Sequence, residues 1–440
     1  MSDQRWSNAY LGYVVLMLTL ASTLSIIDRQ ILNVMIGPVK RDLGGISDTQ
    51  VSLIMGFAFS LFYSFLALPA GWIADRYNRR NLMAAGIVGW SLMTALCGMA
   101  GHYWQLFLAR MGVGVGEATL GPAATSTLSD YFSRERLPLA VGIVASAPFI
   151  GQGLANIGGG PLIDYLESVP NLALPLVGEV YSWQMVFILV GLPGVLLGAV
   201  MLTLREPPRR GRIAEVQAGV PLSDLWVLVR ERRMFFGLIF LAYLGLATQG
   251  WSLFSWIIEY YVRNHGWTRT QIGVSYGSIA MVVGIVGSVS GGLLAGRLLR
   301  SHVRDATLRV AMLASAILLP TAMALTLVED PMTALGLLVP VTFCMAMPNG
   351  LMLATLQSVA PNQLRGQLVA VYLIAVNFLS YTFAPSLPAI LSDYVFASEL
   401  ALGKSISMLA VVNYSVAFVA LALSLKYYRA ALDQAAAWSR

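Results

Sequence analysis

Charged residues are scarce in this chain of 440 residues. They make up 11% of it, whereas hydrophobic residues make up 57% and the mean hydropathy is +0.70. A soluble globular protein carries roughly 25% charged residues, which it needs to cover its surface. The shortage of charge therefore excludes a soluble enzyme, a nucleic-acid-binding protein and a disordered protein.

Histidine and cysteine are rare as well, with three and two residues. Each histidine falls in or beside a predicted loop, while Cys97 and Cys344 lie far apart within apolar stretches. These residues therefore lack the spacing of a metal site, a disulfide or an acid–base pair inside the apolar segments. We expect no metal and no cofactor, and we expect that the protein is not an enzyme.

Long apolar runs are what the chain has instead, and each is long enough to cross a bilayer as a helix. They predict an all-α integral membrane protein with twelve transmembrane helices in two pseudo-symmetric six-helix bundles. No signal peptide is expected, so the first run is counted as a span. The predicted spans are residues 9–37, 50–74, 81–101, 104–129, 138–162, 183–204, 235–262, 271–296, 307–328, 332–358, 366–391 and 405–428.

The longest polar stretch lies between the sixth and seventh spans and divides the chain into two halves. We predict an N-terminal bundle over residues 1–204, a cytoplasmic central loop over 205–233 and a C-terminal bundle over 234–440. Residues 221–233 of the loop can form a short amphipathic helix on the membrane surface. Repeated halves of this kind are typical of secondary transporters.

The positions of lysine and arginine predict the orientation in the membrane. If the N-terminus is cytoplasmic, 21 of the 28 basic residues fall on the cytoplasmic side and five on the other. Both termini are therefore predicted to be cytoplasmic. The net charge of +6 is explained by topology and by contact with membrane lipids, so no nucleic-acid partner is expected.

Three sequence motifs resemble known transporters. The loop from Gly71 to Arg80, GWIADRYNRR, lies between the second and third spans and resembles the signature loop of the major facilitator superfamily. Together with Ile27-Asp28-Arg29 in span one and Arg110-x-Gly112-x-Gly114-x-Gly116-Glu117 in span four, it resembles the Spinster family. The detailed match covers roughly the first 140 residues. Two positions depart from the family pattern: Gln30 replaces a frequent aromatic residue, and Gly296 replaces the acidic residue of the second-half loop.

The Spinster resemblance implies a secondary active transporter that works by alternating access. It implies proton-linked or gradient-driven movement of amphipathic anionic lipids, such as lysophospholipids or sphingosine-1-phosphate. We expect a monomer in the cytoplasmic membrane of a bacterium. The alternative is a drug/proton antiporter of the same superfamily. A carrier of sugars or small organic anions ranks third, because few polar residues are available in the spans.

Four charged residues lie inside the first-half spans: Asp28, Arg29, Arg110 and Glu117. A charge at the middle of a span costs roughly 2.5–3.5 kcal/mol on insertion scales, so it requires a partner or a wet cavity. At a rise of about 1.5 Å per residue, Asp28 and Arg110 lie about 13 Å and about 9 Å from the outer ends of their spans. They are therefore predicted to be able to pair, with Glu117 two turns further along the face of Arg110.

One arginine between two carboxylates can act as a proton switch. When Asp28 or Glu117 is ionised, Arg110 pairs with it; when the carboxylate is protonated, Arg110 is free for an anionic headgroup. We assign proton coupling to Asp28, Glu117 and Arg110, and substrate binding to Arg110, Arg29 and Glu117. A static buried ion pair between spans one and four is the alternative. Arg29 points about 100° away from Asp28, so a cavity-facing role, snorkelling and a structural pair all stay open for it.

The signature loop carries predicted gating residues: Gly71, Asp75, Arg76, Arg79, Arg80 and, before span five, Arg136. Asp75 is expected to pair with Arg136 when the two halves close on the cytoplasmic side. The alternative is that the arginines only set the topology. The strip formed by Gly112, Gly114 and Gly116 is expected to let a neighbouring helix approach closely.

Overall fold

The computed structural model describes residues 6–133, 135–174, 178–209, 222–361 and 363–437. The chain folds into two compact units. Unit 1 consists of Met1–Arg212 and Gly266–Met281, and unit 2 consists of Ile213–His265 and Val282–Arg440. The boundary between Arg212 and Ile213 thus falls within the polar loop predicted over residues 205–233. The start of the eighth predicted span belongs to the first unit. The assignment of residues 1–204, 205–233 and 234–440 to separate domains stays a prediction.

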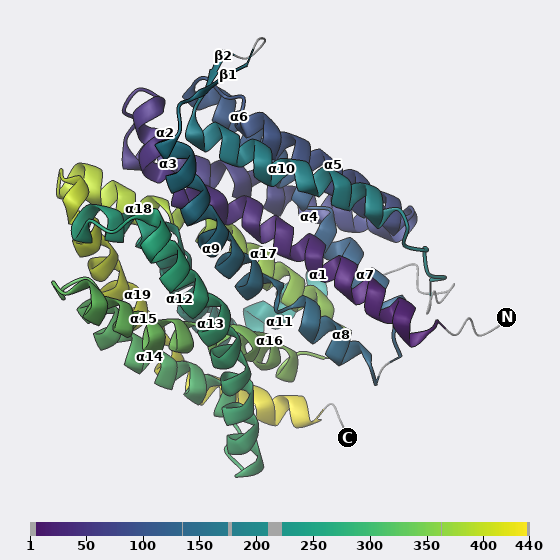
Figure 1. The fold of residues 1–440 in the computed structure, drawn as a ribbon. Coiled ribbons are helices and arrows are strands. Elements are labelled where there is room, and N and C mark those ends of the chain that lie inside the picture. Colours follow the sequence, from purple (N-terminus) through teal and green to yellow (C-terminus); the bar gives the residue numbers. More distant parts are fainter. Residues whose placement is uncertain (1–5, 134, 175–177, 210–221, 362, 438–440) are drawn as a thin grey trace. The chain divides into compact units, whose positions relative to one another are not determined.

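Unit 1 is built from helices that run side by side, among them α5 and α10 (Figure 1). Its elements are α1 (Asn8–Gln30), η1 (Ile31–Val34), α2 (Ile36–Asp42), α3 (Asp48–Met55), α4 (Phe57–Arg76), α5 (Arg79–Cys97), α6 (Tyr103–Glu117), α7 (Leu120–Tyr131), α8 (Leu137–Val144), α9 (Ala147–Ser168), β1 (Leu172–Leu174), β2 (Gly178–Val180) and α10 (Ser182–Met201).

Unit 2 is also helical, and α12 packs along α19 while α14 packs on α15 (Figure 1). Its elements are α11 (Leu222–Glu231), α12 (Arg233–His265), the later part of α13 (Arg269–Arg300), α14 (Ala306–Leu325), α15 (Pro331–Ala346), α16 (Asn349–Ser358), α17 (Arg365–Phe383), α18 (Ser386–Ile390), η2 (Leu391–Val395), η3 (Glu399–Ala401) and α19 (Leu402–Ala437).

The fold is all-α apart from a short hairpin between α9 and α10. Strands β1 and β2 pair antiparallel, with Leu172 opposite Val180. In the described part of the chain, ten helical segments are long and apolar enough to cross a bilayer. The two other predicted spans correspond to α5, which begins with Arg79-Arg80-Asn81, and to the pair α6 and α7, each of which is short. The protein is therefore an integral membrane protein.

Span four is interrupted where a single helix was predicted over residues 104–129. Helix α6 ends at Glu117 and α7 begins at Leu120. The hydroxyl of Thr119 donates to the carbonyl of Gly116 across this break. Ala118 and Thr119 keep right-handed helical backbone angles, and their N–H groups donate to the carbonyls of Gly114 and Gly116. Glu117 thus lies at the end of α6, beside a short break whose N–H groups stay paired.

The glycine strip of α6 contacts two helices. A Cβ atom on Gly114 would lie 2.4 Å from the carbonyl oxygen of Phe59 in α4, and one on Gly116 would lie 2.7 Å from the backbone nitrogen of Trp90 in α5. Both contacts are with backbone, which cannot swing away as a side chain can. The glycines thus let α6 approach its neighbours closely, as the sequence predicts.

Gly114→Ala should lower the free energy of unfolding by about 1–3 kcal/mol, because the added methyl group forces α6 away from α4. Thermal unfolding of the purified protein in detergent measures this loss. Gly121→Ala is the matched control, since a Cβ at Gly121 meets nothing within 4 Å. Equal melting temperatures for the two variants would show that the close approach contributes nothing to stability.

Close backbone packing also explains why the start of α13 belongs to unit 1. A Cβ on Gly160 of α9 would lie 2.4 Å from the carbonyl oxygen of Arg269, and one on Gly273 would lie 2.6 Å from that of Asn156. The carboxylate of Asp164 accepts hydrogen bonds of 2.7 Å from both the backbone nitrogen and the hydroxyl of Thr270. Helices α9 and α13 therefore pack closely, backbone against backbone, and the hydrogen bonds between Asp164 and Thr270 lie at one end of this contact.

An acidic residue joins two arginines before α14. Asp305 bonds to Arg309 at 2.8 Å and to Arg429 at 2.5 Å. Burial raises the pKa of the Asp305 carboxyl, but the hydrogen bonds from Arg429 and Arg309 outweigh it and hold the pKa below its ordinary value. This cluster fixes the end of α19 to the start of α14.

Candidate functional site

The charged residues predicted in the first-half spans gather within unit 1. Glu117, at the end of α6, accepts a 2.6 Å hydrogen bond on Oε2 from Arg29 Nε and another of 2.6 Å from the hydroxyl of Ser25. The side chain of Glu117 is 0% exposed and that of Arg29 is 11% exposed. Arg29 also lies over the rings of Phe59 and Tyr63, at 4.6 and 4.5 Å from their centroids. Arg29 therefore connects an anion with two aromatic faces.

Asp28 lies next to this pair and is fully buried. Neither of its carboxylate oxygens has a hydrogen-bond partner among the described residues. The indole nitrogen of Trp90 and the hydroxyl of Thr94, both on α5, lie close to the carboxyl and are side-chain donors that face it. A buried carboxyl in such surroundings is costly when ionised, so Asp28 is a group well suited to carry a proton.

Arg110 binds backbone instead of a carboxylate. Its Nη1 donates to the carbonyl oxygen of Asp28 at 2.8 Å, and its Nη2 donates to that of Arg29 at 3.5 Å. Helix α1 ends at Gln30, and the last carbonyls of a helix have no partner within it. Arg110 supplies that partner, and its charge favours the negative end of the helix dipole.

In this structure Arg110 pairs with neither carboxylate, so the predicted switch between Arg110 and the two carboxylates stays a prediction. Arg29 holds Glu117, while Arg110 caps the end of α1. The prediction assumed one continuous helix in span one, which has no free carbonyls at Asp28. The role of Ser25 was missed, although it lies four residues before Arg29 and thus on the same helix face.

The cluster formed by Asp28, Arg29, Arg110 and Glu117 is electrically balanced. With both carboxyls ionised, two positive and two negative charges cancel. Protonating either carboxyl leaves the cluster with one net positive charge at membrane depth, where charge interactions are strong. The arrangement can therefore link the gain of a proton to attraction of an anion.

The signature loop has a buried arginine at its end. Arg79 is 1% exposed and donates to Glu206 at 2.7 Å, to Asp130 at 2.5 Å, to Ser126 at 2.9 Å and to the carbonyl of Pro207 at 3.2 Å. All these partners belong to unit 1. The sequence does not predict the roles of Asp130 and Glu206, because each is distant in sequence from the loop.

The other loop residues are more exposed. Arg80 donates to Asn81 at 3.0 Å and to the carbonyl of Leu204 at 3.3 Å, and Arg76 lies 4.0 Å from the ring centroid of Trp72.

Two further loop predictions concern contacts between elements. Arg136 donates to Asn8 Oδ1 at 2.8 Å, so its partner here is not Asp75. A Cβ on Gly71 would meet Pro122 at an ordinary 3.7 Å. The pairing of Asp75 with Arg136 in a closed state stays a prediction, as does the gating role of all six residues.

Unit 2 holds few buried charges in its described part. Glu259 pairs with Arg263 at 2.7 Å one helical turn away. Gln249 accepts a 3.2 Å hydrogen bond from Asn413 and so joins α12 to α19. The cluster of charged residues that was predicted within the spans thus lies in unit 1.

Residues 18–385 match the Major Facilitator Superfamily, and the chain belongs to this family. It is a transporter and not an enzyme. A solved structure of a bacterial homologue of the human lysosomal transporter Spinster, described as inward-facing and unoccupied, is 25% identical with a TM-score of 0.77. That match covers 97% of this chain and 98% of the homologue.

Two curated proteins show how far the similarity extends. An efflux pump of the superfamily from Mycolicibacterium smegmatis is 27% identical over 319 residues, which are 72% of this chain and 69% of the pump. Spinster homolog 1 from Rattus norvegicus is 32% identical over 228 residues, which are 50% of this chain and 40% of that protein. These similarities and the solved structure confirm the Spinster resemblance.

Proposed function

We propose that this protein is a proton-coupled secondary active transporter of amphipathic anionic lipids, such as a lysophospholipid or a lipid like sphingosine-1-phosphate. The similarity to Spinster proteins supports the class of substrate. The charged cluster of unit 1 supports the coupling to protons. The single observation that carries the proposal is the buried carboxyl of Asp28, which has no hydrogen-bond partner in the described chain and lies beside a balanced set of charges.

Asp28 is the proton carrier in this mechanism. When Asp28 takes up a proton, the cluster gains one positive charge and attracts the anionic headgroup. When the proton leaves, the charges balance again and the headgroup is released. Glu117 is bonded to Arg29 and keeps this arginine in place.

Arg110 and Arg29 supply the positive charge for the headgroup. A guanidinium stays protonated and offers a planar set of donors that matches phosphate. Arg110 Nε has no hydrogen-bond partner in the described chain. This nitrogen is therefore available to donate to the headgroup while the other nitrogens donate to backbone carbonyls. Arg29 contributes its charge while it remains bound to Glu117.

A drug/proton antiporter for cationic compounds is the competing function. A cation would be attracted when the cluster loses a positive charge. This is the reverse of the order proposed for an anionic lipid, which binds when the cluster gains a positive charge. Binding of a cation would therefore drive the proton off Asp28, whereas binding of an anion would favour its uptake. The two functions predict opposite pH dependence of binding.

Asp28→Asn should abolish the pH dependence of lysophospholipid uptake, because the amide cannot release a proton. Coupling between two sites is typically worth about 5–150-fold in affinity, so we expect at least about a fivefold ratio between uptake at pH 5.5 and pH 7.5 in the wild type. The variant should bring this ratio to about 1. Uptake of a fluorescent lysophospholipid into proteoliposomes under an imposed pH gradient measures it.

Glu179→Gln is the matched control, because this exposed carboxylate lies in the hairpin and bonds to Asn171. It should behave as wild type. A wild-type pH ratio in Asp28→Asn would overturn the assignment of Asp28. Uptake of a cationic drug or of gluconate, with no uptake of lysophospholipid, would replace the lipid by one of the alternative substrates.

A further inference from the structure

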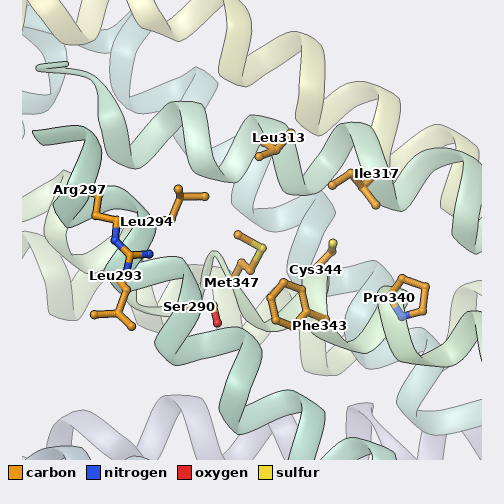
Figure 2. A pocket seen from close by; sticks show the side chains of 10 residues that line it. All are labelled: Ser290, Leu293, Leu294, Arg297, Leu313, Ile317, Pro340, Phe343, Cys344 and Met347. Atoms are coloured by element: carbon orange, nitrogen blue, oxygen red, sulfur yellow. The ribbon is translucent and has the colours of Figure 1, made fainter. Parts of the chain in front are cut away.

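An apolar groove lies between α13, α14 and α15 of unit 2, far in sequence from the charged cluster. It encloses about 490 Å³, a size typical of small-molecule pockets. Figure 2 shows its row of side chains, with Arg297 at one end and Pro340 at the other. Seven residues separate Ser290 from Arg297 on α13, so the groove follows about two helical turns, or about 10 Å.

The walls of the groove are apolar side chains that are partly exposed on the outside of the helices. Leu293 is 54% exposed, Leu313 is 48% exposed and Ile317 is 37% exposed. Below the groove α13 packs closely on the chain of α15 and its C-cap, since a Cβ on Gly287 or Gly291 would lie 2.4 or 2.3 Å from the carbonyl oxygens of Phe343 and Met347. A hydrocarbon chain therefore has apolar surface to occupy along both sides.

Arg297 differs from the arginines around it. Arg309 and Arg429 bind Asp305, and Arg304 binds Asp433 at 2.7 Å. Arg300 donates its Nε to the carbonyl of Gly296 at 3.3 Å. The guanidinium of Arg297, in contrast, makes no hydrogen bond or ion pair with any residue in the described ranges. It is a free cation at the end of an apolar groove.

The first half shows why this cation is free. The loop motifs of the two halves are offset by 221 positions, so Arg297 corresponds to Arg76, Leu293 to Trp72 and Gly296 to Asp75. Arg76 lies over the ring of Trp72, whereas Arg297 has a leucine at that place. The glycine also removes the carboxylate that would neutralise an arginine or repel an anion.

We propose that this groove binds an anionic phospholipid of the bilayer, with the headgroup phosphate on Arg297 and one acyl chain between α13, α14 and α15. Arg297 lies in the last turn of α13, where the charge of a spanning helix reaches headgroup level. Basic pockets between spanning helices bind anionic lipid headgroups in this way. The site is separate from the transport site of unit 1 and does not depend on the proposed substrate.

Native mass spectrometry of the purified full-length protein tests the site, with phosphatidylglycerol and phosphatidylcholine of identical chains as probes. The wild type should retain phosphatidylglycerol more tightly than phosphatidylcholine. Arg297→Gln should weaken phosphatidylglycerol binding about tenfold, the size of effect expected for one hydrogen-bonded charge, and should weaken phosphatidylcholine binding less, because its choline cation already offsets its phosphate. Ser290→Trp, which fills the groove but keeps Arg297, should also reduce retention of phosphatidylglycerol.

Two matched variants make the outcome decisive. Arg300→Gln removes an equal charge one turn further on, outside the groove, and should bind phosphatidylglycerol as the wild type does. Arg304→Gln, which loses a guanidinium paired with Asp433 outside the groove, should do so as well. Equal binding by Arg297→Gln and wild type overturns the proposal. So does an equal loss in Arg300→Gln or Arg304→Gln, which would indicate general attraction to charge.

Discussion

Arg29→Gln should lower the free energy of unfolding by about 3–5 kcal/mol, because it leaves the buried carboxylate of Glu117 without its cationic partner. Ser25 would remain as a donor, but a hydroxyl does not neutralise the charge. For a unit of this size the loss corresponds to a fall in melting temperature on the order of 10 °C. Thermal unfolding of the purified protein in detergent measures it, and the fall should shrink at low pH, where protonation neutralises Glu117.

The double variant Arg29→Gln/Glu117→Gln should regain most of this stability, since two neutral amides need no ion pair. Arg41→Gln is the control: Arg41 pairs with Glu167 at 2.9 Å, but its side chain is 63% exposed, and exposed pairs contribute little. If the losses from the two single substitutions simply add in the double variant, the residues are not coupled. The assignment of Glu117 as the fixed partner of Arg29 would then fail.

The membrane fold is readable from the sequence because long apolar runs report directly on the hydrocarbon core of the bilayer. Helix breaks inside those runs are not readable in this way. A Cβ on Gly86 of α5 would lie 1.9 Å from the hydroxyl of Thr119, so α5 approaches closely at the break between α6 and α7. Hydropathy along the chain contains no record of such contacts between helices.

The candidate site shows the same limit at the level of single residues. Helical rise correctly brings Arg110 to the level of Asp28, because depth depends only on residue count. The atom that Arg110 binds depends on where α1 ends, and the sequence does not show that the carbonyls of Asp28 and Arg29 are free. The charged residues of the site are therefore predictable from the sequence, whereas the bonds between them in this structure are not.

The loop arginines were difficult to separate for a further reason. Arg79 and Arg80 are neighbours in a basic run, and topology alone would explain positive charge in a loop that is predicted to be cytoplasmic. Only their environments differ: Arg79 is buried among two carboxylates, whereas Arg80 contacts an amide and a carbonyl. The partners Asp130 and Glu206 come from α7 and from the segment after α10, which no local pattern connects to the loop.

Arg79→Gln should therefore have a large effect on stability, again about 3–5 kcal/mol, because it leaves Asp130 and Glu206 facing each other without the shared cation. The side chains of these two acids are 9% and 23% exposed, so water screens the repulsion only in part. Arg79→Lys should recover a fraction of the loss, since an ammonium keeps the charge but cannot reach four partners as a planar fork does. Melting temperatures of the purified variants measure both effects.

Arg80→Gln is the matched control and should melt close to the wild type, because its side chain holds no carboxylate. The comparison also separates a structural role from gating. All partners of Arg79 belong to unit 1, so its bonds need not break when the two halves move. A variant Arg79→Gln that melts like the wild type, but changes the labelling of single cysteines on the two membrane faces, would show that Arg79 acts in gating and not in holding the bundle together.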